Sequence, residues 1–262
     1  MKLTCPPAAT TPSADSSVPQ KQCITNPRSP AFFSFRISSA ALALFAPAAS
    51  FPLSAAPQEE KSLTSAQLSE IRQAVRAGQA SVVEELIEKG ASPNFRMENG
   101  DTGFTYALRA DTPQVAEALL KSGKLALNDA NRFGETPLMM AVFKGNSELF
   151  DELLKAGADP KGGTNWTALH YAATGGRTDM IEKLLALGAS PNVQTSSGVT
   201  PLIMAARKPS RASVMELLRA GAYRDYCTDK RESPADFARR AGDQELAKYL
   251  AIETCAVVGK KK

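Results

Sequence analysis

The stretch TPLMMA at residues 136–141 recurs as TALHYA at residues 167–172 and as TPLIMA at residues 200–205. The alanine that ends each copy belongs to a longer series with nearly regular spacing. Intervals of 33, 34, 31, 33 and 33 residues separate its six members, Ala74, Ala107, Ala141, Ala172, Ala205 and Ala238. A fixed period of this length is typical of proteins that are built from stacked structural repeats.

Other positions fall into register with these alanines. A serine or threonine lies five residues before each alanine, where its hydroxyl can cap the free N–H groups of a helix start. These residues are Ser69, Thr102, Thr136, Thr167, Thr200 and Ser233. An apolar pair, such as Leu119-Leu120, follows each alanine at a spacing that suits the core-facing side of a second helix. Gly90, Gly123, Gly157, Gly188 and Gly221 come next, and glycine commonly ends a helix.

These features resemble the ankyrin repeat, whose T-P-L-H-x-A signature the three stretches above match. The resemblance covers residues 62–253 and implies an all-α repeat solenoid of six ankyrin repeats with polar caps. Each repeat would be a helix-turn-helix with a hairpin loop, and neighbours must stack because no repeat buries its apolar side alone. The resemblance also implies that hairpin tips and first helices form a concave face that binds a partner protein.

Several units depart from the pattern. Asp111 and Pro209 replace the glycine that other units have between their helices, and we expect Pro209 to reshape the turn of the fifth unit. The connection at residues 161–166 is two residues short, which predicts a stunted hairpin. The last unit carries the polar residues that a C-terminal cap needs, namely Arg239, Arg240, Asp243, Gln244 and Lys248.

Residues 1–57 are a different kind of sequence. They hold 9 of the 17 prolines and a single acid, Asp15, among many serines and threonines. This composition buries too little apolar surface to fold alone, so we expect disorder. Scarce acids and frequent hydroxyl groups are marks of an organellar transit peptide, and sparse arginine favours a plastid over a mitochondrion. A plain disordered tail is the alternative interpretation.

A second targeting feature lies at residues 36–56, where a basic residue, a short apolar core and small residues follow one another. A transit peptide followed by such a segment resembles the presequence of thylakoid-lumen proteins. We therefore expect a chloroplast protein, with the lumen slightly favoured over the stroma. The alternative is an alanine-rich end to a stromal transit peptide. At the other end of the chain, residues 254–262 are expected to be a flexible basic tail.

Composition and charge limit the classes of function. The chain has 31 basic and 27 acidic residues, and residues 58–262 have 27 and 26, a balance of +1 that does not favour nucleic acid. The one histidine, His170, nearly excludes a histidine-based metal site or catalytic triad. The family resemblance implies instead that His170 hydrogen-bonds between neighbouring units. We expect no enzymatic activity, cofactor, small-molecule substrate or mature transmembrane helix.

Four cysteines raise the question of a disulfide. Cys5 and Cys23 lie in the expected presequence. Cys227 and Cys255 leave two alternatives: two free thiols, or a bridge that staples the C-terminal cap in an oxidising compartment. Free thiols are favoured, because these two positions are five residues out of register and the geometry of a bridge is strict.

The repeat register also predicts the binding face. Trp166, the only tryptophan, is expected on the short hairpin with Phe133 and Phe143 nearby, and exposed aromatics beside arginine are typical of interface hot spots. The alternative is that Trp166 folds back over the truncated hairpin. The predicted protein-binding residues are Arg96, Arg109, Arg132, Phe133, Phe143, Lys144, Asn165, Trp166, Arg207 and Lys208.

The basic residues on this face favour a partner with an acidic or mixed segment, unless they serve only solubility. The leading hypothesis is a non-catalytic protein-protein interaction scaffold or assembly factor in the plastid. The first alternative is single-stranded nucleic-acid binding through the basic face, with bases stacking on the aromatic rings. The last is an enzyme subunit, for which the repeats leave no catalytic segment.

Overall fold

A computed structural model describes residues 64–208 and 210–256. The expected presequence and Pro209 lie outside the described residues. Within these ranges the backbone forms helices and no β-strand, apart from two isolated β-bridges. The helices are α1 (Ser65–Arg76), α2 (Ala80–Glu88), α3 (Gly103–Arg109), α4 (Pro113–Lys121), α5 (Pro137–Lys144), α6 (Ser147–Ala156), α7 (Ala168–Gly175), α8 (Thr178–Ala186), α9 (Pro201–Arg207), α10 (Arg211–Arg219), α11 (Pro234–Arg240) and α12 (Gln244–Tyr249).

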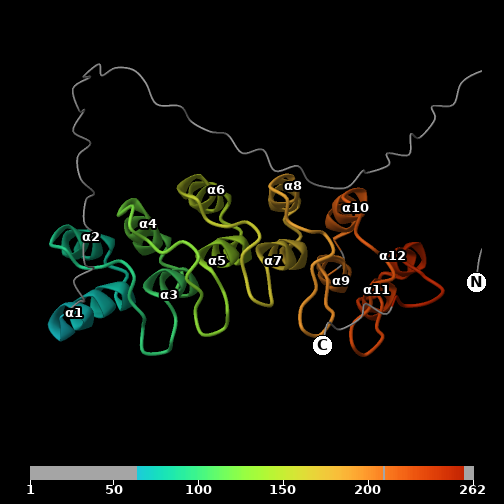
Figure 1. The fold of residues 1–262 in the computed structure, drawn as a ribbon, viewed down its shortest axis with the longest axis horizontal. Helices are drawn as coiled ribbons and strands as arrows, with labels where there is room; N and C mark the ends of the chain where they lie inside the picture. Colours follow the sequence, from blue (N-terminus) through green and yellow to red (C-terminus); the bar gives the residue numbers. More distant parts are fainter. Residues whose placement is uncertain (1–63, 209, 257–262) are drawn as a thin grey trace, which may run out of the picture. The chain divides into compact units, whose positions relative to one another are not determined.

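The helices stack in two layers. Each odd-numbered helix packs against the even-numbered helix that follows it, and neighbouring odd-numbered helices contact one another from α1 to α11. We call the odd-numbered helices the first helices and the even-numbered ones the second helices. The connections between pairs loop out on the side away from the second helices (Figure 1). This all-helical arrangement is consistent with the predicted solenoid.

The predicted cap residues lie at the starts of α3, α5, α9 and α11. The hydroxyls of Thr102, Thr136 and Thr200 each accept a hydrogen bond from the backbone N–H three residues ahead. Ser233 does the same, and its own N–H donates to the carboxylate of Asp236. These contacts satisfy N–H groups that the first turn of a helix leaves free, so the prediction is confirmed here.

The cap prediction is wrong for Ser69, which lies inside α1. The helix begins at Ser65 because Thr64 and Gln67 form a capping box one turn earlier. The Thr64 hydroxyl accepts from the N–H of Gln67 at 3.3 Å, and the Thr64 N–H donates to Gln67 Oε1 at 3.1 Å. Local capping chemistry therefore extends α1 beyond the start that the repeat period predicts.

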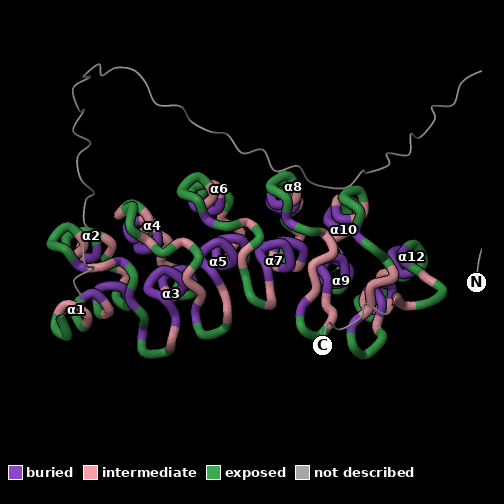
Figure 2. The backbone as a smooth tube through the Cα atoms, in the orientation of Figure 1, coloured by how far each residue is buried: buried purple, intermediate pink, exposed green. Residues whose placement is uncertain are grey.

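The six registered alanines are all buried, with exposed fractions of 2% or less. Their small side chains let adjacent first helices approach closely, and the buried leucines of the second helices complete the core. Figure 2 shows that the buried residues line the contact between the two layers, whereas exposed residues lie at the loop tips and the outer helix surfaces. One member of the predicted apolar pairs, Ala251, is exposed because α12 already ends at Tyr249.

Asp111 shows how one unit keeps its turn without glycine. Its backbone has a φ of 57°, in the left-handed region where the glycines of the other units also lie. Aspartate tolerates this region better than most residues do. Its carboxylate also forms an ion pair with Lys144 of the next unit. The departure from the repeat pattern therefore preserves the turn and adds a contact between units.

The short connection at residues 161–166 lacks a hydrogen bond that the other connections share. In the others, an N–H donates to the carbonyl four residues ahead, as in Asn131 to Glu135 and Thr195 to Val199. No such bond forms in residues 161–166. Gly163 instead has a φ of 123°, and a Cβ placed there would lie 2.1 Å from the carbonyl oxygen of Trp166. The shorter connection therefore brings the Trp166 carbonyl so close to residue 163 that only glycine fits there.

The C-terminal segment folds back on the last connection. Cys227 and Cys255 form a disulfide, and the N–H of Ala256 donates to the Asp225 carbonyl at 2.8 Å. This overturns the favoured expectation of free thiols. The chain turns back after α12, so the repeat register does not govern where Cys255 lies. Residues 254–256, expected to start a flexible tail, are therefore part of the folded unit, and residues 257–262 lie outside the described part.

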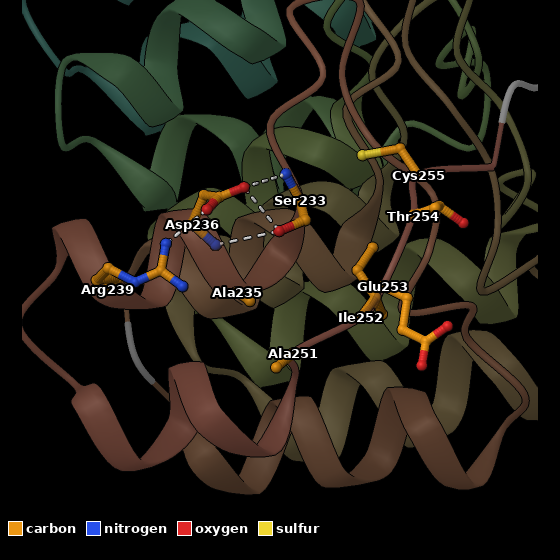
Figure 3. A pocket seen from close by; sticks show the side chains of 9 residues that line it. All are labelled: Ser233, Ala235, Asp236, Arg239, Ala251, Ile252, Glu253, Thr254 and Cys255. Carbon is orange, nitrogen blue, oxygen red and sulfur yellow. Dashed lines mark hydrogen bonds and ion pairs between the residues drawn. The ribbon is translucent and has the colours of Figure 1, made fainter.

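Beside this bridge is a hollow of about 220 Å³, which residues 251–255 border on one side. The capping contacts of Ser233 and Asp236 lie on its other side, with Arg239 bonded to the same carboxylate (Figure 3). The returning segment therefore lies across this hollow from α11 and is joined to the connection that precedes α11.

We expect loss of the disulfide to destabilise the folded unit by about 3 to 4 kcal/mol, because a bridge across 28 residues restricts the unfolded chain. The measurement is urea unfolding of the full chain with Cys5→Ser and Cys23→Ser already in place, with and without Cys255→Ser. Dithiothreitol should lower the free energy of unfolding of the Cys5→Ser/Cys23→Ser parent protein. It should leave that of the Cys255→Ser variant unchanged. Equal stability of the oxidised parent and the variant would contradict this expectation.

Candidate protein-binding face

Two large aromatic side chains are exposed on the side of the first helices and connections. Phe133, at the tip of the connection before α5, is 54% exposed, and Phe143, in the last turn of α5, is 59% exposed. Four polar or aromatic neighbours surround them. We call the six residues Arg109, Arg132, Phe133, Glu135, Phe143 and Tyr171 the aromatic–arginine cluster.

Two guanidinium groups hold the ring of Phe133. The guanidinium carbon of Arg132 lies 4.5 Å from the ring centroid, and that of Arg109 lies 5.2 Å from it. At these distances a cation is attracted to the face of an aromatic ring, by roughly 0.5 to 1 kcal/mol at an exposed site. Phe133 is therefore positioned by contacts from α3 and from its own connection while most of the ring stays open to solvent.

Glu135 joins three neighbouring units. Its carboxylate accepts from Arg109 of α3 at 2.6 Å and from Asn131 of its own connection at 2.8 Å. It also accepts from the Tyr171 hydroxyl of α7 at 2.9 Å. Charge-assisted bonds of this kind are shorter and stronger than neutral ones. The cluster is therefore a connected network, and its geometry is fixed before any partner arrives.

Asp101 is a buried residue that contacts this network. Its side chain is almost fully buried, and it accepts from Asn131 at 2.9 Å and from Asn99 at 2.7 Å. The guanidinium of Arg109 lies 3.4 Å from the same carboxylate. A buried carboxylate without partners would be costly, so these contacts keep the connection in one conformation.

Tyr171 links Phe143 to the network. Its ring meets the ring of Phe143 edge to face, with the centroids 6.1 Å apart. Burial and the neighbouring Glu135 carboxylate raise the pKa of the Tyr171 hydroxyl above its usual value, because both disfavour the phenolate. The hydroxyl therefore stays protonated and donates to Glu135.

A family model described as ankyrin repeats in three copies matches this chain twice, over residues 71–163 and 169–260. Together these matches cover well over half of the 262 residues. The chain belongs to the ankyrin-repeat family.

Each similar protein matches this chain over a small part of its own length. It is 29% identical over 172 residues to the human SH3 and multiple ankyrin repeat domains protein 2, a match that covers 64% of this chain and 9% of that protein. It is 37% identical over 144 residues to the ankyrin repeat domain-containing protein SAT10 of Stachybotrys chartarum, covering 45% of this chain and 7% of that protein. The match to the E3 ubiquitin-protein ligase Ufd4 of Drosophila melanogaster is 31% over 116 residues, covering 42% of this chain and 4% of that protein.

This chain therefore spans less than a tenth of the length of these relatives. Ankyrin repeats are in general protein-protein interaction modules, and that coarse function carries over. What the longer proteins do outside their repeats does not, because a shared fold does not establish a shared activity.

Trp166 is not the exposed anchor that the sequence favoured. It is half-buried and packs against the core, with its ring centroid 5.3 Å from that of His170 and 6.5 Å from that of Tyr171. The backbone carbonyl of Trp166 lies close to Gly163 within the short connection. The alternative of a tryptophan that folds back over the truncated hairpin is the one observed.

Several of the predicted binding residues already have partners within the protein. Arg96 bonds to Asp129 at 2.6 Å and to the carbonyl of Ala130 at 3.0 Å, and Lys144 pairs with Asp111. Asn165 accepts from the N–H of Ser196 at 2.6 Å. Arg207 and Lys208 are exposed and lie at the end of α9, in the unit that follows Tyr171, outside the aromatic–arginine cluster. Four of the ten predicted residues therefore belong to the aromatic–arginine cluster, namely Arg109, Arg132, Phe133 and Phe143, and the other six lie outside it.

The sequence prediction missed Tyr171. The residue just before the registered alanine is aromatic three times, at Tyr106, Tyr171 and Phe237, and all three are half-buried at the edge of the core. This pattern is a signal that the sequence offers. Which of the three would meet an exposed aromatic ring depends on the neighbouring unit, and only Tyr171 lies beside Phe143.

His170 joins two ankyrin units, as the family resemblance implied. It is fully buried; its Nδ1 lies 3.0 Å from the Thr167 hydroxyl, and its Nε2 lies 3.1 Å from the Val199 carbonyl. Burial lowers the pKa of His170 from 6.5 to about 4, because the charged imidazolium would lose its hydration. The side chain is therefore a neutral, structural group.

Within the described part of the chain, no helix has both the length and the hydropathy to cross a membrane. The same residues bring together no group of three or more histidine, cysteine, aspartate or glutamate side chains that could hold a metal ion.

The lowered pKa of His170 predicts a pH-dependent stability. Between about pH 6.5 and 4 the unfolded chain binds a proton more readily than the folded chain, so the free energy of unfolding is greatest above pH 6.5 and falls toward pH 4. The loss attributable to this group is on the order of 3 kcal/mol. Urea unfolding at several pH values should show a flatter profile over this window for His170→Gln. Parallel profiles for the two proteins would count against the proposed burial of a neutral imidazole.

Proposed function

We propose that this chain is a non-catalytic scaffold that binds a partner protein through the face of its first helices and connections. The observation that carries the proposal is the exposure of Phe133 and Phe143 in a network that is rigid without a partner. Aromatic and arginine side chains dominate the binding energy of many interfaces. A pre-organised site also loses less conformational entropy on binding.

We further propose that each of the six helix pairs is one ankyrin repeat.

The ion pairs of this face refine the kind of partner. Arg109 is bonded to Glu135, and Lys144 to Asp111, so these cations have little charge left to attract an acidic surface. The aromatic–arginine cluster is therefore suited to an apolar anchor of a partner, with Arg132 at its edge. The same pairing weighs against single-stranded nucleic acid, which needs cations free to contact phosphates.

The test is affinity purification of the full chain with a C-terminal tag, comparing wild type with Phe133→Ala/Phe143→Ala. We expect a defined protein to co-purify with wild type and its recovery to fall by roughly tenfold with the double variant. Both side chains are exposed, so circular dichroism should show an unchanged fold.

The matched control is Leu187→Ala/Met215→Ala. These side chains are 47% and 37% exposed on the layer of the second helices, away from the proposed face. They should leave recovery unchanged. Equal recovery with all three proteins would place the binding site elsewhere, and equal loss with both variants would indicate non-specific apolar capture.

We also propose that the scaffold acts in a plastid. Support comes from the composition of residues 1–57, and the disulfide between Cys227 and Cys255 favours an oxidising compartment such as the thylakoid lumen over the stroma.

A C-terminal fluorescent fusion should enter chloroplasts when expressed in plant cells, and a fusion without residues 2–57 should not. Fractionation of the chloroplasts should then recover the protein from the lumen. A fusion that reaches mitochondria, or that stays in the cytosol, would overturn the plastid assignment and leave the scaffold proposal untouched.

A further inference from the structure

The cations along the first helices differ in whether they are neutralised. At the C-terminal ends of α1, α3, α5 and α11, a basic residue pairs with a carboxylate of the same or a neighbouring unit. The pairs are Arg76 with Glu98, Arg109 with Glu135, Lys144 with Asp111, and Arg240 with Glu232. The corresponding residues of α9 are Arg207 and Lys208. Both are exposed, and neither lies within ion-pair distance of a carboxylate in the described part of the chain.

A hollow lies next to Arg207, the first of these two cations. It has a volume of about 410 Å³, and Arg207 forms one wall from α9, while Phe237, Arg240 and Ala241 form the other from α11. The two helices pack side by side. The ring of Phe237 is half-buried, and the guanidinium of Arg240 lies over it with its carbon 4.8 Å from the ring centroid. The hollow therefore combines an apolar wall with uncompensated positive charge.

We propose that the hollow between the C-terminal ends of α9 and α11 binds an acidic peptide segment of the partner protein. A carboxylate of that segment pairs with Arg207 and Lys208, and an adjacent apolar side chain packs on Phe237. Opposite charge favours this occupant, because a carboxylate restores at α9 the pairing that every other basic end of a first helix already has.

A nucleic acid fits this surface less well. It would need free cations at successive phosphates, whereas the neighbouring cation Arg240 is held by Glu232 at 2.6 Å and α7 contributes no basic residue in its last turn. Among the C-terminal ends of the first helices, the unpaired charge lies at α9, which suits one or two carboxylates. This inference rests on the proposed scaffold function and adds a second contact zone, separate from the aromatic–arginine cluster.

The experiment measures fluorescence anisotropy of a labelled peptide that alternates aspartate and leucine, titrated with the full chain. A peptide with asparagine in place of each aspartate is the probe control. We expect wild type to bind the acidic peptide at least roughly tenfold more tightly than the control peptide, and Arg207→Glu/Lys208→Glu to abolish that preference. Equal binding of the two peptides by wild type would overturn the proposal.

A variant of equal charge locates the effect. Lys121→Glu/Lys155→Glu changes the net charge by the same amount on exposed lysines of the second helices, and it should leave the affinity within about twofold of wild type. If this variant weakens binding as much as Arg207→Glu/Lys208→Glu does, the attraction is a property of overall charge and the proposed site is wrong.

A second pair of variants tests the hollow itself. Ala241 and Ala110 are exposed C-cap residues of α11 and α3 with closely similar backbone angles. Ala241→Glu places a carboxylate in the hollow beside Arg207 and should weaken binding of the acidic peptide by roughly fivefold, whereas Ala110→Glu should not. A larger loss of peptide affinity with Ala110→Glu than with Ala241→Glu would show that the binding site is not at this hollow. The scaffold proposal is tested separately, by partner recovery with Phe133→Ala/Phe143→Ala. Failure of the peptide-binding experiment would therefore overturn the site at α9 and α11 without affecting the scaffold proposal.

Discussion

The structure depends on the close packing of neighbouring first helices through one small residue per unit. Six alanines, from Ala74 to Ala238, are buried where these helices meet. A larger side chain at this position would separate adjacent units and disrupt the core that they share. Because each helix pair has apolar surface on both sides, its stability comes largely from its neighbours, as in other linear repeat proteins.

Regular stacking also places the connections beside one another, and the polar network follows from that. Arg109, Glu135 and Tyr171 belong to three successive units and are far apart in sequence, yet Arg109 and Tyr171 both donate hydrogen bonds to the Glu135 carboxylate. Glu135 pairs with Arg109, and Asp111 pairs with Lys144, on this side of the molecule. The large apolar side chains that the aromatic–arginine cluster exposes are Phe133 and Phe143. Binding energy on such a surface comes from apolar contact and shape. Among the basic C-terminal ends of the first helices, only α9 keeps cations without an ion pair in the described part of the chain.

The two ends of the described solenoid are finished by different chemistry. At the N-terminal end, a capping box extends α1 and satisfies its first N–H groups. At the C-terminal end, the chain turns back and a disulfide fixes it to the last connection. A terminal unit has a neighbour on one side only, so it loses half of the packing that stabilises the internal units. A covalent link compensates for this at the end whose last helix, α12, has only 6 residues.

The sequence alone determined the helical architecture and the register of the units, because these follow from a repeated local pattern of caps and apolar residues. It also identified Phe133 and Phe143 as surface aromatics. It did not determine which cations are free, where Trp166 points, or that Cys255 meets Cys227. Each of these depends on contacts between units or on a segment that leaves the repeat pattern. Tertiary structure decided them, because an ion pair such as Arg109 with Glu135 forms only when stacking brings distant residues within bonding distance.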